Sequence, residues 1–503
     1  MPQIDTLPGR ALRPRSARVT GRATEIGVMA VVAWGVLAFG AVYPWAYWPL
    51  LAGAVLVGAL AYGAAKPADR LSRTMLPVAA ALTIIAGAAT LQIVPLPASV
   101  RTAISPATEP FLRSTDVPYA AAAALREQGA GTASMPRRPL SVHPAATGRA
   151  IALLAGFTVF LVGLNRYFGR HGVRGIVPAL VGLGVLIAMI GIVQKAVLGD
   201  HAWMGMKIYG IWAPHYKLTT PFGPFVNKNH YAGWMLMTLP LAVGYLIGLA
   251  ESGAAHVRPR WRDRLLWLSS PEGGRLQLSA FAIVIMGAAL ALTKSRSGIG
   301  CFALTIAAAG VTAARGQRSA RTRVGIIGAV AVLVAVPLLW ANVDLATRFT
   351  SGGESVELRR QAWGDALAVM RDFPLAGTGL NTYGSATLLY NTAQTDLHFQ
   401  EAHNDYVQLA AEGGLLLAIP ALVAIVACVR GVRRRLAEDR REPMRYWIRF
   451  GAATGLAAIA IQSAVEFSLQ MPGNAVLFAV LCAIALHERV PPMNTGRPVT
   501  RAR

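Results

Sequence analysis

The chain alternates long apolar runs with shorter polar segments that are often basic. Apolar runs of about 17 to 25 residues are long enough to cross a lipid bilayer as helices. We find about twelve such runs, at residues 25–43, 46–65, 75–95, 148–167, 175–196, 231–250, 277–293, 298–314, 324–341, 406–429, 447–466 and 474–488. The pattern therefore predicts an all-α polytopic membrane protein.

One polar interruption, at residues 342–404, is the longest in the C-terminal two thirds of the chain, and we interpret it as a large loop outside the lipid that carries groups able to move protons. Inside it, residues 354–370 have helical spacing, and Pro374 would end this helix. The expected apolar stripe of this helix consists of Val356, Trp363, Leu367 and Met370. The residues Gly377-Thr378-Gly379 predict a flexible turn after it.

Two further outer loops are predicted, at 96–147 and 197–230. The first is rich in Pro, Gly and Ala, so we expect an ordered but irregular cap or a partly mobile loop, with a short stretch from Ala120 to Arg126 that is able to form a helix. The remaining divisions follow from the spans: a basic cytoplasmic tail at 1–24, an N-terminal bundle at 25–341, C-terminal transmembrane helices at 405–489 and a cytoplasmic tail at 490–503.

The distribution of basic residues predicts the orientation of the chain in the membrane. The 48 Lys and Arg residues outnumber the 24 Asp and Glu residues, which gives a net charge of +24. Most of the basic residues fall in every second loop when the N-terminus is placed inside. Because cytoplasmic loops retain positive charge, we expect both termini in the cytoplasm. No soluble basic module with interleaved aromatics is visible, so nucleic acid is not an expected partner, whereas anionic lipid is. Three cysteines lie inside predicted spans and suggest no disulfide framework.

Several cations are expected to meet in the outer compartment. Lys294 and Arg296 lie in a short outer loop, where the positive-inside rule disfavours cations. Lys228 stands at the outer entrance of another span, between Asn227 and Asn229. The long loop adds two more cations, Arg359 and Arg360. Such a group fits a diphosphate, which Arg grips with two hydrogen bonds and Lys as a point charge.

His403 is the candidate for proton transfer, because histidine has an unperturbed pKa near working pH. Glu401, Asn404 and Asp405 are its polar neighbours. The pair His398 and His403 superficially suggests a zinc site, but five residues of helix would separate them by about 140°. No Asp-x-Asp pair occurs in the chain. We therefore predict no metal and no cofactor.

Four stretches together resemble the O-antigen ligase and polymerase family of bacterial envelope glycosyltransferases. They are Phe222 to Gly233, Thr293 to Gly298, Arg360 to Trp363 with Asp372 to Gly379, and Glu401 to Tyr406 with Glu412 to Gly414, and they span about residues 220–420. The stretch Pro139-Leu140-Ser141 also resembles the family.

The resemblance implies the helical fold of lipid-dependent (GT-C type) glycosyltransferases and a position in the bacterial inner membrane. It also implies that the loop at 342–404 is a large periplasmic catalytic loop. It implies transfer of a glycan from polyprenyl diphosphate to a hydroxyl acceptor without a metal. The family histidine corresponds to His403 and one family arginine to Arg296, while Lys228 stands where ligases have a second arginine.

The acceptor stays open among the lipid A core, a growing polysaccharide and a protein hydroxyl. The competing function is a transporter such as a lipid-linked glycan flippase, which would carry ionisable groups near the middle of the bilayer. Most predicted spans lack an internal charge, with Glu412 and Glu466 the main exceptions.

Overall fold

The computed structural model describes most of the chain, namely residues 15–64, 71–128, 135–198, 207–209, 212, 220–254, 261–316, 320–340, 353–391 and 398–489. Parts of the predicted tails and of the loops at 197–230 and 342–404 therefore lie outside the described residues.

The described residues form helices and isolated bridges, with no strand among them. The first helices are α1 (Arg15–Leu37), α2 (Pro44–Ala64), α3 (Leu76–Ile93), α4 (Ala98–Ile104), α5 (Thr108–Thr115), α6 (Val117–Glu127), α7 (Pro144–His171) and α8 (Ile176–Leu198). The middle ones are α9 (Lys228–Ala254), α10 (Trp261–Leu268), α11 (Pro271–Leu292), α12 (Arg296–Arg315), α13 (Ala320–Trp340), α15 (Gly353–Asp372) and α16 (Tyr383–Tyr390). The last are α17 (Asp405–Glu438), α18 (Pro443–Gln462) and α19 (Pro472–Leu486), and short 3₁₀ turns are η1 (Phe39–Ala41), η3 (Asp439–Arg441) and η4 (Ser468–Gln470).

Eight of the described helices are long and apolar enough to cross a membrane: α2, α3, α7, α8, α9, α11, α12 and α17. Eight of the predicted spans overlap these helices, and the other four overlap α1, α13, α18 and α19. The prediction of a polytopic helical membrane protein is confirmed. The predicted ends of the spans were less accurate. The span predicted at 447–466 corresponds to α18, which ends at Gln462.

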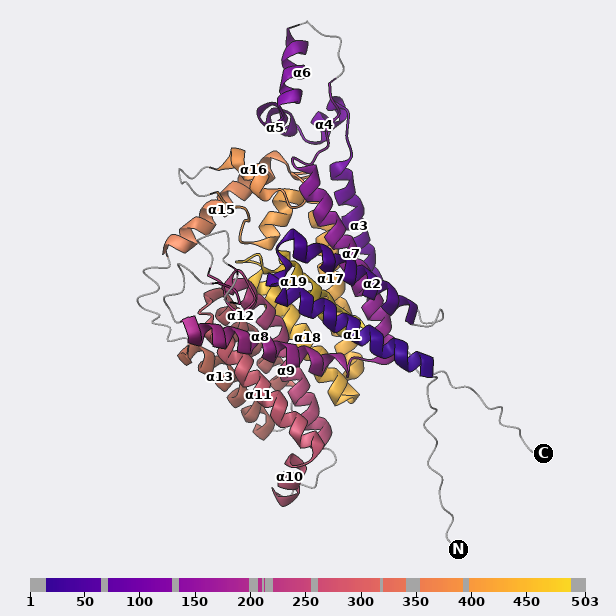
Figure 1. Cartoon of the computed structure of the whole chain (residues 1–503), viewed down its shortest axis with the longest axis vertical. Helices are drawn as coiled ribbons and strands as arrows, with labels where there is room; N and C mark the ends of the chain where they lie inside the picture. The colour runs from indigo at the N-terminus through magenta and orange to yellow at the C-terminus, as the bar shows by residue number, and fades with distance from the viewer. Residues whose placement is uncertain are drawn as a thin grey trace, which may run out of the picture.

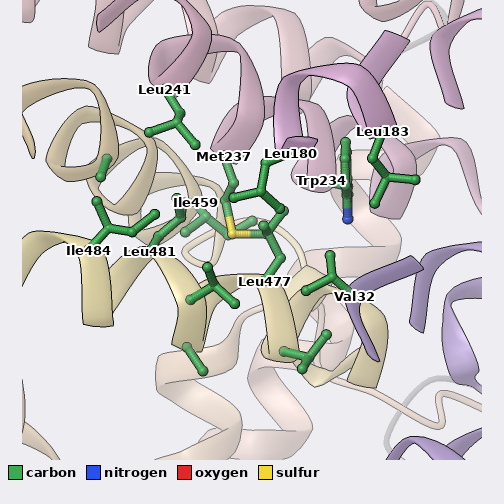
Figure 2. Close-up of a cluster of buried hydrophobic side chains, with 14 of the residues drawn as sticks. Val32, Leu180, Leu183, Trp234, Met237, Leu241, Ile459, Leu477, Leu481 and Ile484 are labelled. Carbon is green, nitrogen blue, oxygen red and sulfur yellow. The ribbon is translucent and has the colours of Figure 1, made fainter. Parts of the chain in front are cut away.

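The main core lies where α1, α8, α9, α18 and α19 converge. Figure 2 shows side chains from these helices pointing toward one another, and those of Trp234, Met237, Ile459 and Leu477 are fully buried. Helix α9 is mostly enclosed by neighbouring helices, whereas α17 leaves most of its apolar surface on the outside of the bundle. Helix α9 is therefore a central element of the fold.

Helices α9 and α18 approach each other so closely that side chains would not fit between them. A Cβ atom on Gly451 would lie 2.4 Å from the carbonyl oxygen of Pro240, and one on Gly455 would lie 2.7 Å from that of Met237. Small residues allow this contact, which matters in lipid because the hydrophobic effect does not drive helices together there. The packing fixes the end of α18 against the beginning of α9.

The two ends of the molecule differ in structure. Figure 1 shows α4, α5 and α6 beyond the ends of α3 and α7 at the top, α15 and α16 in the upper half, and α10 at the bottom. The predicted irregular cap at 96–147 is thus wrong in part, because it contains three helices; the helix expected at 120–126 is confirmed within α6. Buried Arg101 joins these helices, since it pairs with Glu109 at 2.8 Å and contacts Tyr119.

The cap helices enter and leave the bundle through one narrow neck. The backbones of Leu96 and Arg138 are hydrogen-bonded to each other in both directions, at 3.0 and 3.3 Å. Beyond this neck, Arg138 also holds Asp116, the residue that caps α6.

Helix α15 confirms the helix predicted at 354–370, but its buried face matches the predicted stripe only in part, through Met370, which packs against the buried cluster that contains Ala366 and Val369. Leu367 is 48% exposed, whereas Ala362, Ala366 and Val369 are buried. Alanine is too weakly apolar to stand out in a sequence pattern, yet it permits the close packing of α15 on α17. The side chain of Val356 lies outside the described part of the chain.

Candidate active site

Four elements meet at the end of the bundle nearest α15. They are the first turns of α9, α12 and α17 and the segment that follows α18. Three of them are helix N-termini, whose unpaired N–H groups and dipoles favour negative charge. The place is therefore suited to anions before any side chain is considered.

Glu466 is the centre of this meeting point. Its carboxylate is fully buried and lies in the segment after α18. One oxygen, Oε1, accepts hydrogen bonds from Arg359 at 2.5 Å and from Asn229 at 2.7 Å. The other, Oε2, lies 3.5 Å from Nδ1 of His403. Residues far apart in the sequence are thus joined through one carboxylate.

The charge of this carboxylate is fixed by its neighbours. Burial would raise the pKa of Glu466, but His403 and Arg359 outweigh burial, and its pKa is lowered below the usual 4.5. Glu466 is therefore ionised at neutral pH. At 3.5 Å the contact with His403 is long for a hydrogen bond.

His403 is held in a constrained conformation beside Glu466. Its φ of 52° is unusual for a residue other than glycine. The edge-on ring of Phe467 lies 4.8 Å from the His403 ring and 4.7 Å from the His230 ring. With Nδ1 turned toward Glu466, Nε2 lies on the opposite side of the ring, and 29% of the side chain is exposed.

Lys228 and Arg296 begin two helices whose ends are tied together. Ser295 donates from its hydroxyl to Oδ1 of Asn229 at 2.8 Å, so the residue before α12 is bonded to the second residue of α9. Asn229 also donates to Glu466. Lys228 is thus next to Asn229, which bonds Glu466, and Arg296 is next to Ser295, which bonds Asn229.

The predicted supporting residues mostly shape the helix ends. Asn404 caps α17 by accepting from the backbone of Tyr406 and Val407, and Asn227 accepts from the backbone of Asn229. Asp405 accepts from Gln470 at 2.9 Å. These contacts fix the backbone on either side of His403 and Lys228.

Glu401 belongs to a second, neighbouring network. Gln408 donates to Glu401 at 2.5 Å and to Glu412 at 3.1 Å. Loss of water around the carboxylate raises the pKa of Glu401 to about 8. Glu412 accepts backbone N–H groups of Asn381, Thr382 and Tyr383 and so fixes the chain before α16.

The predicted glycine turn packs between this network and the cap. Gly377 and Gly379 have φ of 64° and 105°, which glycine adopts at little cost. The carbonyl oxygen of Thr378 accepts from the backbone of Val142, and Gln92 donates to the carbonyl of Ala376. The stretch beginning at Pro139 therefore rests on the turn.

The structure does not bring every predicted cation to Glu466. Arg360 is exposed and bonds Glu357 at 2.6 and 2.8 Å on the outer face of α15. Lys294 is half-buried before α12, with φ of 52°. Among the described residues no group of three or more His, Cys, Asp or Glu side chains is arranged to hold a metal ion.

Glu466 itself was not among the predicted site residues. The sequence placed it at the end of a span, where it counted only as an exception to charge-free helices. The signal that could have identified Glu466 is its position, because it is a carboxylate at the outer end of an apolar run.

The family model described as O-Antigen ligase matches residues 281–422. This match confirms the predicted resemblance to the O-antigen ligase and polymerase family over that segment. The matched segment contains Arg296, Arg359 and His403, while Lys228 and Glu466 lie outside it. A comparison with curated proteins finds no match.

Proposed function

We propose that the chain is a membrane glycosyltransferase that transfers a glycan from a polyprenyl diphosphate to a hydroxyl acceptor on the periplasmic side. The observation that carries the proposal is the buried, ionised Glu466 between Arg359, Asn229 and His403. A histidine oriented by a carboxylate is a recurring arrangement for taking a proton from a hydroxyl group.

In the proposed reaction, Nε2 of His403 accepts the proton of the acceptor hydroxyl as its oxygen attacks the anomeric carbon. The bond between that carbon and the phosphate oxygen breaks, and polyprenyl diphosphate leaves with the bonding electrons. Direct displacement inverts the anomeric configuration. Glu466 stabilises the imidazolium that forms, so it acts as a positioning residue for His403.

Lys228 and Arg296 are proposed to bind the donor diphosphate, whose charge grows as the bond breaks. Their helices contribute N-terminal dipoles of the same sign. Arg359 already shares its charge with Glu466, so its role in this scheme is to hold the carboxylate in place.

The test is a transfer assay with purified protein in liposomes, a lipid-linked oligosaccharide and an acceptor glycan, with no ion gradient. We expect wild-type protein to form product and His403→Ala to form at least about a hundredfold less. His398→Ala is the matched control, because His398 is an exposed histidine of the same loop. Equal activity of His403→Ala and wild type would contradict the proposal, as would glycan crossing the membrane unchanged.

A further inference from the structure

A polar cavity lies at the other end of the bundle from Glu466. It has a volume of about 460 Å³ and is formed by the α7–α8 connection, the end of α9, the start of α18 and the residues after α19. Because α9 begins and α18 ends at the candidate active site, the cavity and the active site lie at opposite ends of the same two helices.

The cavity is rich in guanidinium groups. Five arginines line it against a single acidic side chain: Arg170, Arg174, Arg441, Arg445, Arg489 and the carboxylate of Glu442. That carboxylate is already shared, since it lies 2.6 Å from Arg445 and 4.0 Å from Arg489. The cavity therefore carries an excess of positive charge.

Two of these arginines have no counter-charge from the described residues. No carboxylate of the described chain lies within ion-pair distance of Arg174 or Arg441. Both are exposed and line the cavity from different segments, one between α7 and α8 and one before α18. A concave site lined by cations concentrates its field on an anion inside it.

Ion pairs and a hydrogen bond connect the segments around the cavity. Arg449 is buried beside it, pairs with Asp439 at 2.8 Å and donates to the carbonyl oxygen of His487 at 3.2 Å. Arg445 reaches Asp439 as well, at 3.2 Å. Arg449 thus joins the turn before α18 to the chain after α19 through one ion pair and one hydrogen bond, neither of which uses Arg174 or Arg441.

We propose that this cavity binds the phosphodiester of an anionic phospholipid headgroup. Guanidinium groups bind phosphate oxygens with paired, charge-assisted hydrogen bonds. A basic pocket between the ends of membrane helices is at headgroup depth, and in the predicted topology it faces the cytoplasmic leaflet. A free phosphate ion offers the same oxygens, so the experiment separates lipid from free anion.

The experiment compares lipid retention by the full-length protein after purification from nanodiscs. The probes are dioleoylphosphatidylglycerol and dioleoylphosphatidylcholine, counted by native mass spectrometry. We expect phosphatidylglycerol to be retained and phosphatidylcholine to be lost. The double variant Arg174→Gln/Arg441→Gln is expected to bind phosphatidylglycerol about tenfold more weakly or worse.

The matched control is Arg433→Gln/Arg440→Gln, which removes two exposed arginines from the same end of the molecule outside the cavity lining. Equal weakening in both double variants would overturn the proposal, because it would mean diffuse attraction to the basic surface. Retention of phosphatidylcholine to the same extent would overturn it too. Displacement of phosphatidylglycerol by millimolar inorganic phosphate would assign the site to a free anion instead.

Both double variants are compared with wild type by size-exclusion profile and melting temperature. If the double variant does not fold, Arg441→Gln alone gives the same comparison against Arg440→Gln, since both lie in the short turn before α18. The readout is lipid binding at the end of the bundle remote from His403, so it does not depend on the proposed glycan transfer.

Discussion

Oε2 of Glu466 lies 3.5 Å from Nδ1 of His403, and the same carboxylate accepts a hydrogen bond from Arg359 through its other oxygen. A single buried group thus fixes the orientation of the candidate base and of a neighbouring cation. This relationship makes the proposed chemistry testable at a residue that does not touch the substrate.

Replacing Glu466 by Gln keeps the shape of the side chain and removes its charge. We expect the transfer rate to fall about a hundredfold or more, because the imidazolium of His403 would lose its counter-charge. The measurement is kcat and KM in the liposome assay together with the folded fraction: kcat per folded molecule should fall, while KM for the lipid-linked donor should stay close to that of the wild type. A purely structural role for Glu466 would reduce the folded fraction without changing kcat per folded molecule.

Glu357→Gln is the control for Glu466→Gln, since Glu357 is a partly exposed carboxylate paired with Arg360. Its activity should equal that of the wild type.

The stability of the folded protein should depend on pH through the protonation of Glu401. An unfolded glutamate has a pKa near 4.5, and in the fold the pKa of Glu401 is raised to about 8. Between these values the folded state holds the extra proton, so the free energy of unfolding falls as pH rises. We expect the melting temperature of the wild type to fall relative to Glu401→Gln from about pH 5 to pH 8. Parallel curves for the two proteins would contradict this prediction.

Lys228 and Arg296 should both be needed for binding of the donor, and Lys228 should tolerate replacement by Arg. Loss of either cation, in Lys228→Ala or Arg296→Ala, is expected to raise KM for the lipid-linked donor about 10- to 100-fold, because a charge-assisted contact is lost. Lys228→Arg should stay active, since it keeps the charge. The measurement is initial rate against donor concentration.

The control for these two variants is Arg371→Ala, which removes an exposed cation at the end of α15. An effect of Arg371→Ala as large as that of Arg296→Ala would indicate general attraction of the donor instead of a specific site.

The contact of α9 with α18 should be sensitive to side-chain size. In Gly451→Val the new Cβ would lie 2.4 Å from the carbonyl oxygen of Pro240, and overpacking of this kind costs about 1–3 kcal/mol. We expect a lower melting temperature and weaker transfer, because Asn229 and Glu466 are held together at the end of this helix pair. Gly287→Val is the control, since a Cβ there meets no atom within 4 Å.

The sequence predicted the helical membrane fold because apolar runs report directly on burial in lipid. The ends of the helices were harder to predict, since they depend on capping residues and on contacts with other parts of the fold. The end of α18 illustrates this: its apolar run continues past Gln462, but the chain turns there because Glu466 is drawn to Arg359 and Asn229.

The site could be predicted only in part for a related reason. His403 stood out because histidine is a common general base and because its neighbours in the sequence are polar. The partners of Glu466 come from segments more than 60 residues away, with no spacing that a pattern could show. Only the three-dimensional packing of α9 against α18 brings Asn229 to Glu466. The pairing of Arg360 with Glu357, in contrast, is a local contact one helical turn apart.

The neck at Leu96 and Arg138 has an evolutionary consequence. Because the two segments of chain are hydrogen-bonded to each other where they leave the bundle, the separation of α3 and α7 at this point should not depend on the length of the cap between them. We therefore expect changes of length in the cap to be tolerated without changes in the membrane helices.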